Sequence, residues 1–443
     1  MFDIVRCMLR TLALLALSLH AAAADIVLQD VTLIDGTGHA PLAHATVVIR
    51  DGRIASVSAA ADQVTRTNAR HIRLSGKTVM PALINAHGHL GLTEGTASGP
   101  QVYSAANIER QLMQYQRYGV TRVLSLGLNH DLVYDLRKEQ LSGHLGGATI
   151  MTADRGFGAF HGVPPSTMSD IVYRPSTPEE ARQEARETAS RKPDFIKLWL
   201  DDSLGTQPKM PPEIYGAIID EAHRQGFKVA AHVFYLDDAK QLVRDGVDVL
   251  AHSVRDKTVD DELIGLMKQH GTFYIPTLQL EEAFFIYSEK PPWTDSAFFR
   301  LGVTPDLAAF LVRQANTQHR QFLVTAEQNV KRLADAGIAI AFGTDSGAFP
   351  TRIQGFAEHR ELYLMVSSGL TPLQAIHSAT AVNARLLGVT ARTGTIEQGK
   401  DADLLVLDAD PSADISATTR LAAVWQRGVE VVPLHESSGI HWQ

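Results

Sequence analysis

Between residues 79 and 388 the sequence alternates apolar, strand-like runs with amphipathic helical stretches, and this alternation restricts the fold more than any other feature. The strand-like runs are VMPALINAH, VTRVLSLG, GATIMTA, FIKLWL, KVAAHVF, DVLAHSV, FYIPTL and IAIAFGTD. The helical stretches include SAANIERQLMQYQRYG, STPEEARQEARETASRK and PPEIYGAIIDEAHRQG. A repeated βα order is typical of an α/β fold with a parallel sheet. Eight units in about 300 residues predict a (β/α)8 TIM barrel over residues 81–390, with the active site at the carboxyl ends of the strands.

An open, doubly wound parallel sheet would show the same alternation. Folds of that kind that bind nucleotides carry a glycine-rich loop after the first strand. Here the first run continues into HGHLGL, which has no such phosphate-binding pattern. We therefore favour the barrel.

The two ends of the chain have a different pattern, with short β-rich runs separated by turns. They include IVLQDVTLIDG, ATVVIRDGRIASVSA and HIRLSG near the start, and GTIEQGKDADLLVLDAD and LAAVWQRGVEVV near the end. Asp51 and Gly52 lie between two such runs and predict a β-hairpin. Neither end is long enough to bury a good core alone, so we expect residues 25–80 and 391–443 to form one small β-sandwich domain.

Residues 1–24, MFDIVRCMLRTLALLALSLHAAAA, have the layout of a secretory signal peptide. Arg6 and Arg10 precede an apolar run that is too short to span a bilayer, and small residues end at Ala24. Cleavage would remove Cys7, the only cysteine, so that any metal in the mature chain must be held by His, Asp, Glu or a modified residue. We expect a periplasmic or secreted protein without a membrane anchor.

The charge of the chain limits its partners. The formal net charge is -8, and Lys and Arg form no dense run. Binding to nucleic acid or to an anionic membrane would require a concentrated positive face. We therefore expect a small-molecule substrate and no nucleic acid, and the sequence leaves the formation of a homo-oligomer open.

Polar side chains that can bind a metal lie at the ends of, or within, five of the apolar runs. They are His87 and His89 at the first run, Lys197 in the fourth, His232 in the fifth, His252 in the sixth and Asp345 in the eighth. On a strand, residues two apart face the same side, so the first two imidazoles would face one space. A charged lysine within a buried strand is rarely tolerated without a partner or a function.

Each of these residues also has a purely structural interpretation. The first histidine pair could sit in a turn, and the two later histidines could be hydrogen-bonded core residues. Lys197 could form a buried ion pair with Asp201 or Asp202. Asp345 could cap a helix. Six such coincidences at the ends of different strands are less expected than one shared site.

The order HxH, Lys, His, His and Asp on eight βα units, flanked by a split β domain, resembles the amidohydrolase superfamily of metal-dependent hydrolases. The closing GTIEQGKDADLLVLD is similar to the family's return into the β domain. The sequence around His252 and Asp345 is most similar to the imidazolonepropionase-like and dipeptidase-like branch. The resemblance covers nearly the whole mature chain and implies a hydrolase that acts on C–N bonds.

The resemblance also implies a metal centre of one or two divalent ions, with zinc as the first choice. His87, His89 and Asp345 would hold one ion, and His232 and His252 a second. Lys197 would bridge the ions as a carbamate formed with carbon dioxide, since burial favours the neutral amine. A hydroxide bridging the metals would attack the substrate, with Asp345 as general base and then general acid.

Substrate contacts are predicted from loops at the mouth of the barrel. Arg255 could bind a substrate carboxylate, or pair with Asp256 or Asp260 on the surface. Tyr235 and His161 are the other candidates. We expect a dipeptide or an N-acyl amino acid as substrate. The alternatives are a cyclic amidase of the imidazolonepropionase-like kind, a lactonase, or a catalytically inactive periplasmic binding protein.

Overall fold

The computed structural model describes residues 24–59, 68–435, 439–440 and 442. The predicted signal peptide, with Cys7, lies outside the described residues except for Ala24, and the periplasmic or secreted location stays a prediction. Within the described ranges, no helix has the length and apolar character that crossing a membrane requires.

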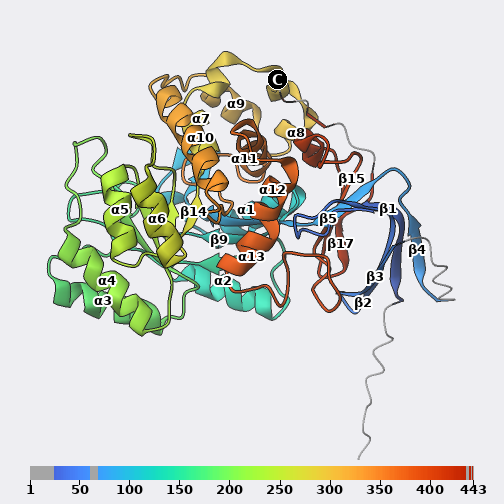
Figure 1. Cartoon of the computed structure of the whole chain (residues 1–443), viewed down its shortest axis with the longest axis horizontal. Helices are drawn as coiled ribbons and strands as arrows, with labels where there is room; N and C mark the ends of the chain where they lie inside the picture. Colours follow the sequence, from blue (N-terminus) through green and yellow to red (C-terminus); the bar gives the residue numbers. More distant parts are fainter. Residues whose placement is uncertain (1–23, 60–67, 436–438, 441, 443) are drawn as a thin grey trace, which may run out of the picture.

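Strands from both ends of the chain form one sheet at one side of the molecule (Figure 1). Across the sheet the order is β17 (Val429–Val432), β16 (Leu421–Gln426), β15 (Leu404–Leu407), β5 (Thr78–Pro81), β1 (Ile26–Leu33), β2 (Leu42–Arg50) and β3 (Arg53–Ser58), and β4 (Arg70–Arg73) also pairs with β1. The turn between β2 and β3 has positive φ at Asp51 (48°) and Gly52 (77°), as a two-residue hairpin requires. The predicted hairpin is therefore confirmed.

The strand β1 is shared between two arms of this sheet. Its first half pairs with β4 and its end pairs with β5, both in parallel. The change of partner falls next to Asp30, whose φ of 61° marks an irregularity in the pairing with β2. Side chains from both chain ends, among them Val47 and Trp425, pack in one buried apolar cluster. The two ends thus depend on each other for a core.

The middle of the chain forms two parallel sheets. One has the order β10 (Thr149–Thr152), β9 (Val120–Ser125), β6 (Leu83–Gly88), and the other β11 (Ile196–Leu200), β12 (Val229–Val233), β13 (Val249–Ala251), β14 (Phe273–Ile275). These strands correspond to seven of the eight predicted runs, and a small two-stranded ladder, β7 (Thr93–Glu94) and β8 (Ala97–Ser98), follows the first of them.

Helices surround these sheets on the outside (Figure 1). They are α1 (Ala105–Arg117), α2 (Leu132–Leu141), α3 (Pro178–Ser190), α4 (Pro212–Arg224), α5 (Leu236–Arg244), α6 (Asp261–His270), α7 (Leu278–Glu282), α8 (Ala297–Arg300), α9 (Pro305–Leu311), α10 (His319–Asp335), α11 (Phe356–Ser367), α12 (Pro372–His377) and α13 (Asn383–Leu386). Pro212 opens α4, where a missing N–H costs nothing, and Ile214, Ile218 and Ala222 form its buried face.

Backbone hydrogen bonds link the two sheets at both edges. Between β10 and β11, Asp194 N donates to Thr152 O (2.8 Å). At the other edge the segment 338–345 lies between β14 and β6: Ala341 N donates to Tyr274 O (2.8 Å), and Ala86 N donates to Phe342 O (3.0 Å). The result is a barrel-like arrangement of parallel strands.

The prediction of an eighth regular strand is wrong. Residues 338–345 form only one isolated bridge, between Ile340 and Tyr274, because their few backbone hydrogen bonds are divided between β14 and β6. The close approach to β6 needs a glycine at position 343, where a Cβ atom would lie 2.6 Å from His87 Cβ. The segment then turns at Asp345, which has a φ of 59°.

Residues from one face of most of these strands, with Phe195 before β11 and Ala341 of the segment 338–345, form one interior apolar cluster. Its members include Ile84, Ala86, Leu124, Met151, Phe195, Ala230, Val249, Ala251, Ile275 and Ala341. This arrangement places one face of most strands toward a common centre, as in a closed parallel sheet.

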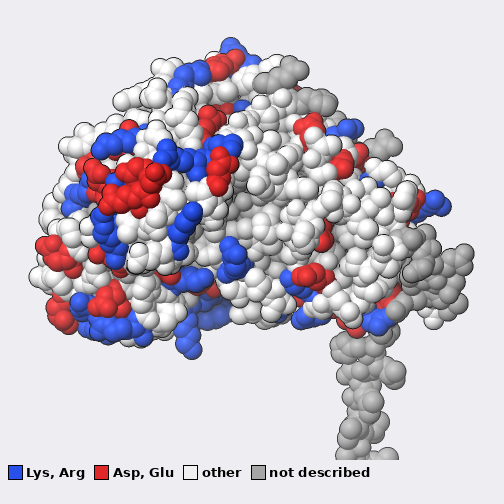
Figure 2. Space-filling view, viewed as in Figure 1, with Lys and Arg blue, Asp and Glu red and all other residues white. Residues whose placement is uncertain are grey.

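Acidic and basic side chains lie next to one another on the face formed by α3–α6 (Figure 2). Lys240, for example, lies 2.6 Å from a carboxylate oxygen of Asp260 and 2.7 Å from one of Glu262. Such exposed pairs each contribute little to stability.

Candidate active site

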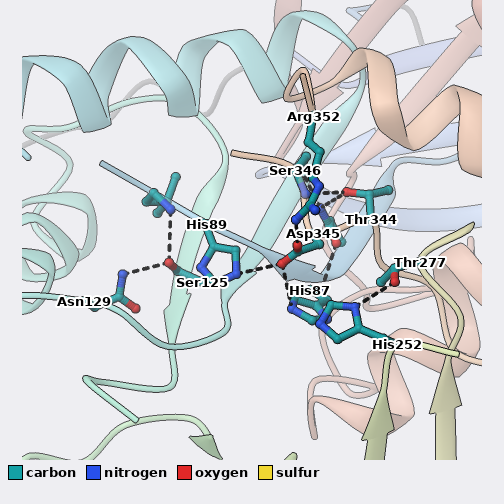
Figure 3. Close-up of polar contacts among 12 residues, drawn as sticks. His87, His89, Ser125, Asn129, His252, Thr277, Thr344, Asp345, Ser346 and Arg352 are labelled. Atoms are coloured by element: carbon teal, nitrogen blue, oxygen red, sulfur yellow. Dashed lines mark hydrogen bonds and ion pairs between the residues drawn. The ribbon is translucent and has the colours of Figure 1, made fainter. Parts of the chain in front are cut away.

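Three of the six predicted ligands meet in one place. His87 is the last residue but one of β6, His89 directly follows the strand, and Asp345 ends the segment 338–345 beside β6. Asp345 Oδ1 lies 3.1 Å from His87 Nε2 and 2.9 Å from His89 Nε2 (Figure 3). One ligand atom from each residue lies within 4.8 Å of the other two, and all three residues are buried. The end of β6 and the residue after it therefore bring both imidazoles to one carboxylate.

The other two histidines lie beside this group but are not part of it. The ring of His252 is 4.5 Å from that of His87 and 4.3 Å from that of His232. His252 Nδ1 bonds to Thr277 Oγ1 (2.8 Å), and His232 Nε2 bonds to Asp201 Oδ2 (2.8 Å). The four imidazoles thus form a continuous row across the ends of β6, β12 and β13.

Lys197 is buried on β11, and its Nζ has no hydrogen-bond partner among the described residues. The alternative ion pairs do not form, because Asp201 bonds to His232 and Asp202 accepts a hydrogen bond from Tyr235. The amine lies 5.4 Å from the centre of the Trp199 ring. Burial lowers the pKa of Lys197 from 10.5 to about 7.

The protonation states suit metal ligands. Burial, and then the nearby Lys197 charge, lower the pKa of His87 to about 3, and burial also lowers the pKa of His232 and His252. These imidazoles are therefore neutral at pH 7. Burial alone would raise the pKa of Asp345, but Arg352 and the two histidine contacts hold it well below its usual value. The site combines neutral imidazoles with an ionised carboxylate, which is the form in which both bind metals.

Buried polar contacts fix the loops that carry these residues. Glu358 on α11 accepts hydrogen bonds from Asn85 Nδ2 (2.6 Å), Thr344 Oγ1 (2.7 Å) and Ser346 Oγ (2.7 Å). The flanks of Asp345 are thereby tied to β6 and to α11. His252, Thr277 and Asp345 all have positive φ, namely 79°, 48° and 59°. Strained backbone of this kind is often found at functional sites.

A cavity of about 350 Å³ opens beside these residues. Its polar lining includes His89, Asp201, His232, His252, Arg255, Glu281, His319, Asp345 and Arg352, and its apolar lining includes Leu128, Val163, Pro164, Met168, Trp199, Leu280, Phe284 and Phe322. Residues of the loop 154–166 and of the segment 281–302 therefore contribute to its wall.

The three predicted substrate contacts have different positions. Arg255 is buried, lines the cavity and pairs with Glu281 (2.7 Å), and not with the surface aspartates that follow it. Tyr235 Oη donates to Asp202 (2.7 Å), and the exposed His161 packs against Phe160. Tyr235 and His161 are outside the described lining of the cavity, and their contact with substrate stays a prediction.

The sequence model of the amidohydrolase family matches residues 78–431. The chain belongs to the amidohydrolase family. Ochratoxinase of Aspergillus niger is 26% identical over 442 residues, which cover 89% of this chain and 84% of the relative. Imidazolonepropionase of Shouchella clausii is 24% identical over 367 residues, which cover 82% of this chain and 71% of the relative. The crystal structure of a putative prolidase from Bifidobacterium longum is similar with a TM-score of 0.75 and 28% identity, over 94% of this chain and 97% of that chain.

These similarities confirm the predicted family, including its imidazolonepropionase and dipeptidase relatives. They support a TIM-barrel-like fold with an additional domain and a hydrolase that acts on C–N bonds. Members of the amidohydrolase family generally bind divalent metals and act on small molecules, which agrees with the cluster of His87, His89 and Asp345. The alternative of a barrel kept for binding alone is set aside.

Sequence reasoning missed several residues of this amidohydrolase site. Arg352 bonds to Asp345 through Nη1, and Glu281 lies between Arg255 and His319. The pKa of Glu281 is lowered: burial would raise it, but Arg255 and the hydrogen bond to His319 outweigh burial. The sequence could have indicated Arg352, because it is a basic residue only seven positions after Asp345. Nothing in the sequence indicated Glu281, whose partners are on other elements.

Proposed function

We propose that this amidohydrolase cleaves the C–N amide bond of a dipeptide or an N-acyl amino acid, with one or two divalent ions at the carboxyl ends of a closed (β/α)8 barrel. The observation that carries the proposal is the convergence of His87, His89 and Asp345 beside a cavity of about 350 Å³. Cavities of this size enclose small organic molecules.

The donor set fits a divalent ion. The Nε2 atoms of His87 and His89 both face Asp345 Oδ1, at 3.1 and 2.9 Å, so these three atoms could hold one ion together. Imidazole and carboxylate donors suit zinc, which we take as the native metal. We assign the first ion to His87, His89 and Asp345 and a second to the adjacent His232 and His252.

Lys197 would connect the two groups as a carbamate. Its pKa of about 7 leaves much of the amine neutral at pH 7. In the reaction, Nζ forms a bond to the carbon of carbon dioxide and loses a proton to water. The product has two oxygen donors in place of an ammonium group that cannot bind a cation. The lack of a described hydrogen-bond partner for Nζ supports this assignment, since a carbamate would be held by metal.

When bound, the metal supplies Lewis acidity that lowers the pKa of water and polarises the substrate carbonyl. Asp345 is ionised at pH 7, so one of its carboxylate oxygens can accept the proton of the attacking water and donate it to the leaving nitrogen. Thr277 orients His252 by its hydrogen bond at Nδ1. The apolar wall, with Trp199 and Phe284, excludes bulk water from the reacting groups.

The cavity wall supports the substrate class. Trp199, Phe284 and Phe322 offer apolar surface to an acyl group. Arg255 and Arg352 bring two guanidinium groups to the same cavity, and guanidinium groups are well suited to binding carboxylates. A dipeptide or an N-acyl amino acid has both features.

The test is metal-dependent release of an amino acid. The chain is reconstituted with zinc or manganese and incubated with a panel of dipeptides, N-acyl amino acids, cyclic amides and lactones. We expect one or two bound ions per chain by elemental analysis and hydrolysis of the first two classes, and expect chelation to abolish it. Turnover confined to cyclic amides or lactones would refute the substrate class. A chain that binds no metal, or is fully active without it, would refute the mechanism.

A further inference from the structure

Arg352 is one of the two buried arginines of the cavity, and the reaction steps proposed above do not involve it. It follows Asp345 on the loop that leads to α11, is 6% exposed, and lines the cavity. Its Nη1 bonds to Asp345 Oδ2, and its Nε has no hydrogen-bond partner among the described residues (Figure 3). A guanidinium group has five N–H donors in a planar fork, so a single contact with one carboxylate leaves most of its binding capacity unused.

Two aromatic rings flank the Arg352 guanidinium group, and the charges of Glu281 and Arg255 also act on it. Its Cζ lies 5.4 Å from the ring centre of Phe284 and 5.0 Å from that of Phe349. Contacts with aromatic faces attract a cation without occupying its N–H donors. The head group is therefore held in place and remains available to an anion in the cavity.

Arg255, the other arginine of the cavity, makes its polar contacts with groups of the protein itself. Its Nη1 donates to Val233 O (3.0 Å) and Ser253 O (2.8 Å), and its Nε lies 2.7 Å from Glu281 Oε1. These contacts hold the Arg255 guanidinium group against two backbone carbonyl groups and beside Glu281. Of the two, Arg352 is therefore better placed to bind a charged ligand.

The position of Arg352 also matches the geometry of an amino acid. In a dipeptide or an N-acyl amino acid, three covalent bonds separate the scissile carbonyl carbon from the carboxylate carbon, a distance of roughly 3 to 4 Å. Asp345 faces the histidines with Oδ1 and Arg352 with Oδ2. A carbonyl held next to Oδ1 thus places a carboxylate near the guanidinium group.

We propose that Arg352 is a specificity-determining residue that binds the α-carboxylate of the substrate's leaving amino acid. This inference rests on the proposed function and narrows its substrate class. The leaving group must have a free carboxylate, and compounds with a neutral amide or ester at that position are poor substrates. The acyl side faces the apolar wall that includes Trp199 and Phe322.

The test compares an N-acyl amino acid with the same compound as its neutral methylamide, using the metal-reconstituted chain. We expect the wild type to prefer the free acid. Arg352→Gln should lower kcat/KM for the acid by about 10- to 100-fold, mainly through KM, and should remove most of the preference over the methylamide. Arg352→Lys keeps the charge without the fork and should retain part of the preference. Arg313→Gln, at an exposed arginine, is the matched control and should behave as wild type.

A structural role for Arg352 would give a different result. If Arg352 only positions Asp345, then Arg352→Gln lowers kcat for acid and methylamide equally, or lowers the metal content, and the proposal is overturned. If Arg352→Gln does not fold, the same measurements are made on Arg352→Lys. An equal loss of kcat for acid and methylamide, or a lower metal content, then overturns the proposal. A wild type that hydrolyses both compounds equally, with metal, overturns this inference and leaves the proposed function intact. Loss of all metal-dependent amide hydrolysis in the wild type overturns both.

Discussion

Replacing Lys197 by Met should stabilise the metal-free protein. The Nζ of Lys197 is fully buried and has no described hydrogen-bond partner, and burial lowers its pKa from 10.5 to about 7. Above pH 10.5 the amine is neutral in both the folded and the unfolded chain. As the pH falls from 10.5 to about 7, the unfolded chain binds a proton that the folded chain does not bind. The metal-free wild type therefore loses stability over this pH window.

The magnitude follows from the same pKa values. Each pH unit of the window corresponds to about 1.4 kcal/mol, so the whole window from 10.5 to about 7 gives about 5 kcal/mol as an upper bound. Methionine has a similar length and no charge. We compare the unfolding free energy of the metal-free Lys197→Met variant with that of the metal-free wild type at each pH. We expect the variant-minus-wild-type difference to be about 2 to 5 kcal/mol larger at pH 7 than at pH 10.5. Differences in packing between the two side chains cancel in this comparison.

The assay is urea unfolding of chelator-treated proteins in buffer free of carbon dioxide, at pH 7 and pH 10.5. The matched control is Lys138→Met, since the side chain of Lys138 is 76% exposed and should show no such pH dependence. An equal difference between Lys197→Met and the wild type at both pH values would refute the reasoning. After reconstitution the sign should reverse, because the variant loses the ion that Lys197 helps to bind.

Three further perturbations test the site and the fold. Asp345→Asn should keep the circular dichroism spectrum and lower kcat by about 100- to 10,000-fold, and near-normal turnover would exclude Asp345 as the general base. Thr277→Val leaves Nδ1 of His252 without its partner and should weaken metal binding about 10- to 100-fold in competition with a chelator, and unchanged affinity would contradict the orienting role. In the fold, the hydrogen bond to Asp248 raises the pKa of His223, so this contact stabilises below pH 6.5 and is lost as the pH rises through the higher folded value. His223→Gln should therefore cost about 0.5 kcal/mol at pH 5.5 and almost nothing at pH 9, and equal urea midpoint shifts at both pH values would argue against this.

Most of the fold could be predicted from the sequence, because the patterns that indicate strands and helices are local. A buried parallel strand is a short apolar run, and seven of the eight predicted runs form strands. The eighth run, residues 338–345, is equally apolar but divides its hydrogen bonds between β14 and β6. Periodicity describes which side chains are buried and contains no information on where backbone groups find partners. That is why the sequence placed this segment correctly and misjudged its conformation.

The candidate site was predictable to the extent that its residues end strands. His87 lies on β6 and His89 directly follows it, and the resemblance to the amidohydrolase superfamily grouped Asp345 with them. Glu358 and Glu281 had no such signal, because each lies on a helix and acts on residues of other segments. Their roles depend on how helices pack against the barrel-like core, and a single sequence does not give this.

The residues of the site lower the stability of the fold, and this is itself an argument for metal binding. Three non-glycine residues at the strand ends, His252, Thr277 and Asp345, have left-handed backbone, and each such conformation is of order 1 kcal/mol or more unfavourable. A buried amine adds unmet hydrogen-bonding capacity at the same point. A chain selected for stability alone would replace these residues with apolar ones, as it has at Ala230 and Ala251 one or two positions away. Their concentration around one cavity is explained if a bound cation satisfies them together, and the metal should then raise the unfolding free energy of the wild type more than that of Lys197→Met.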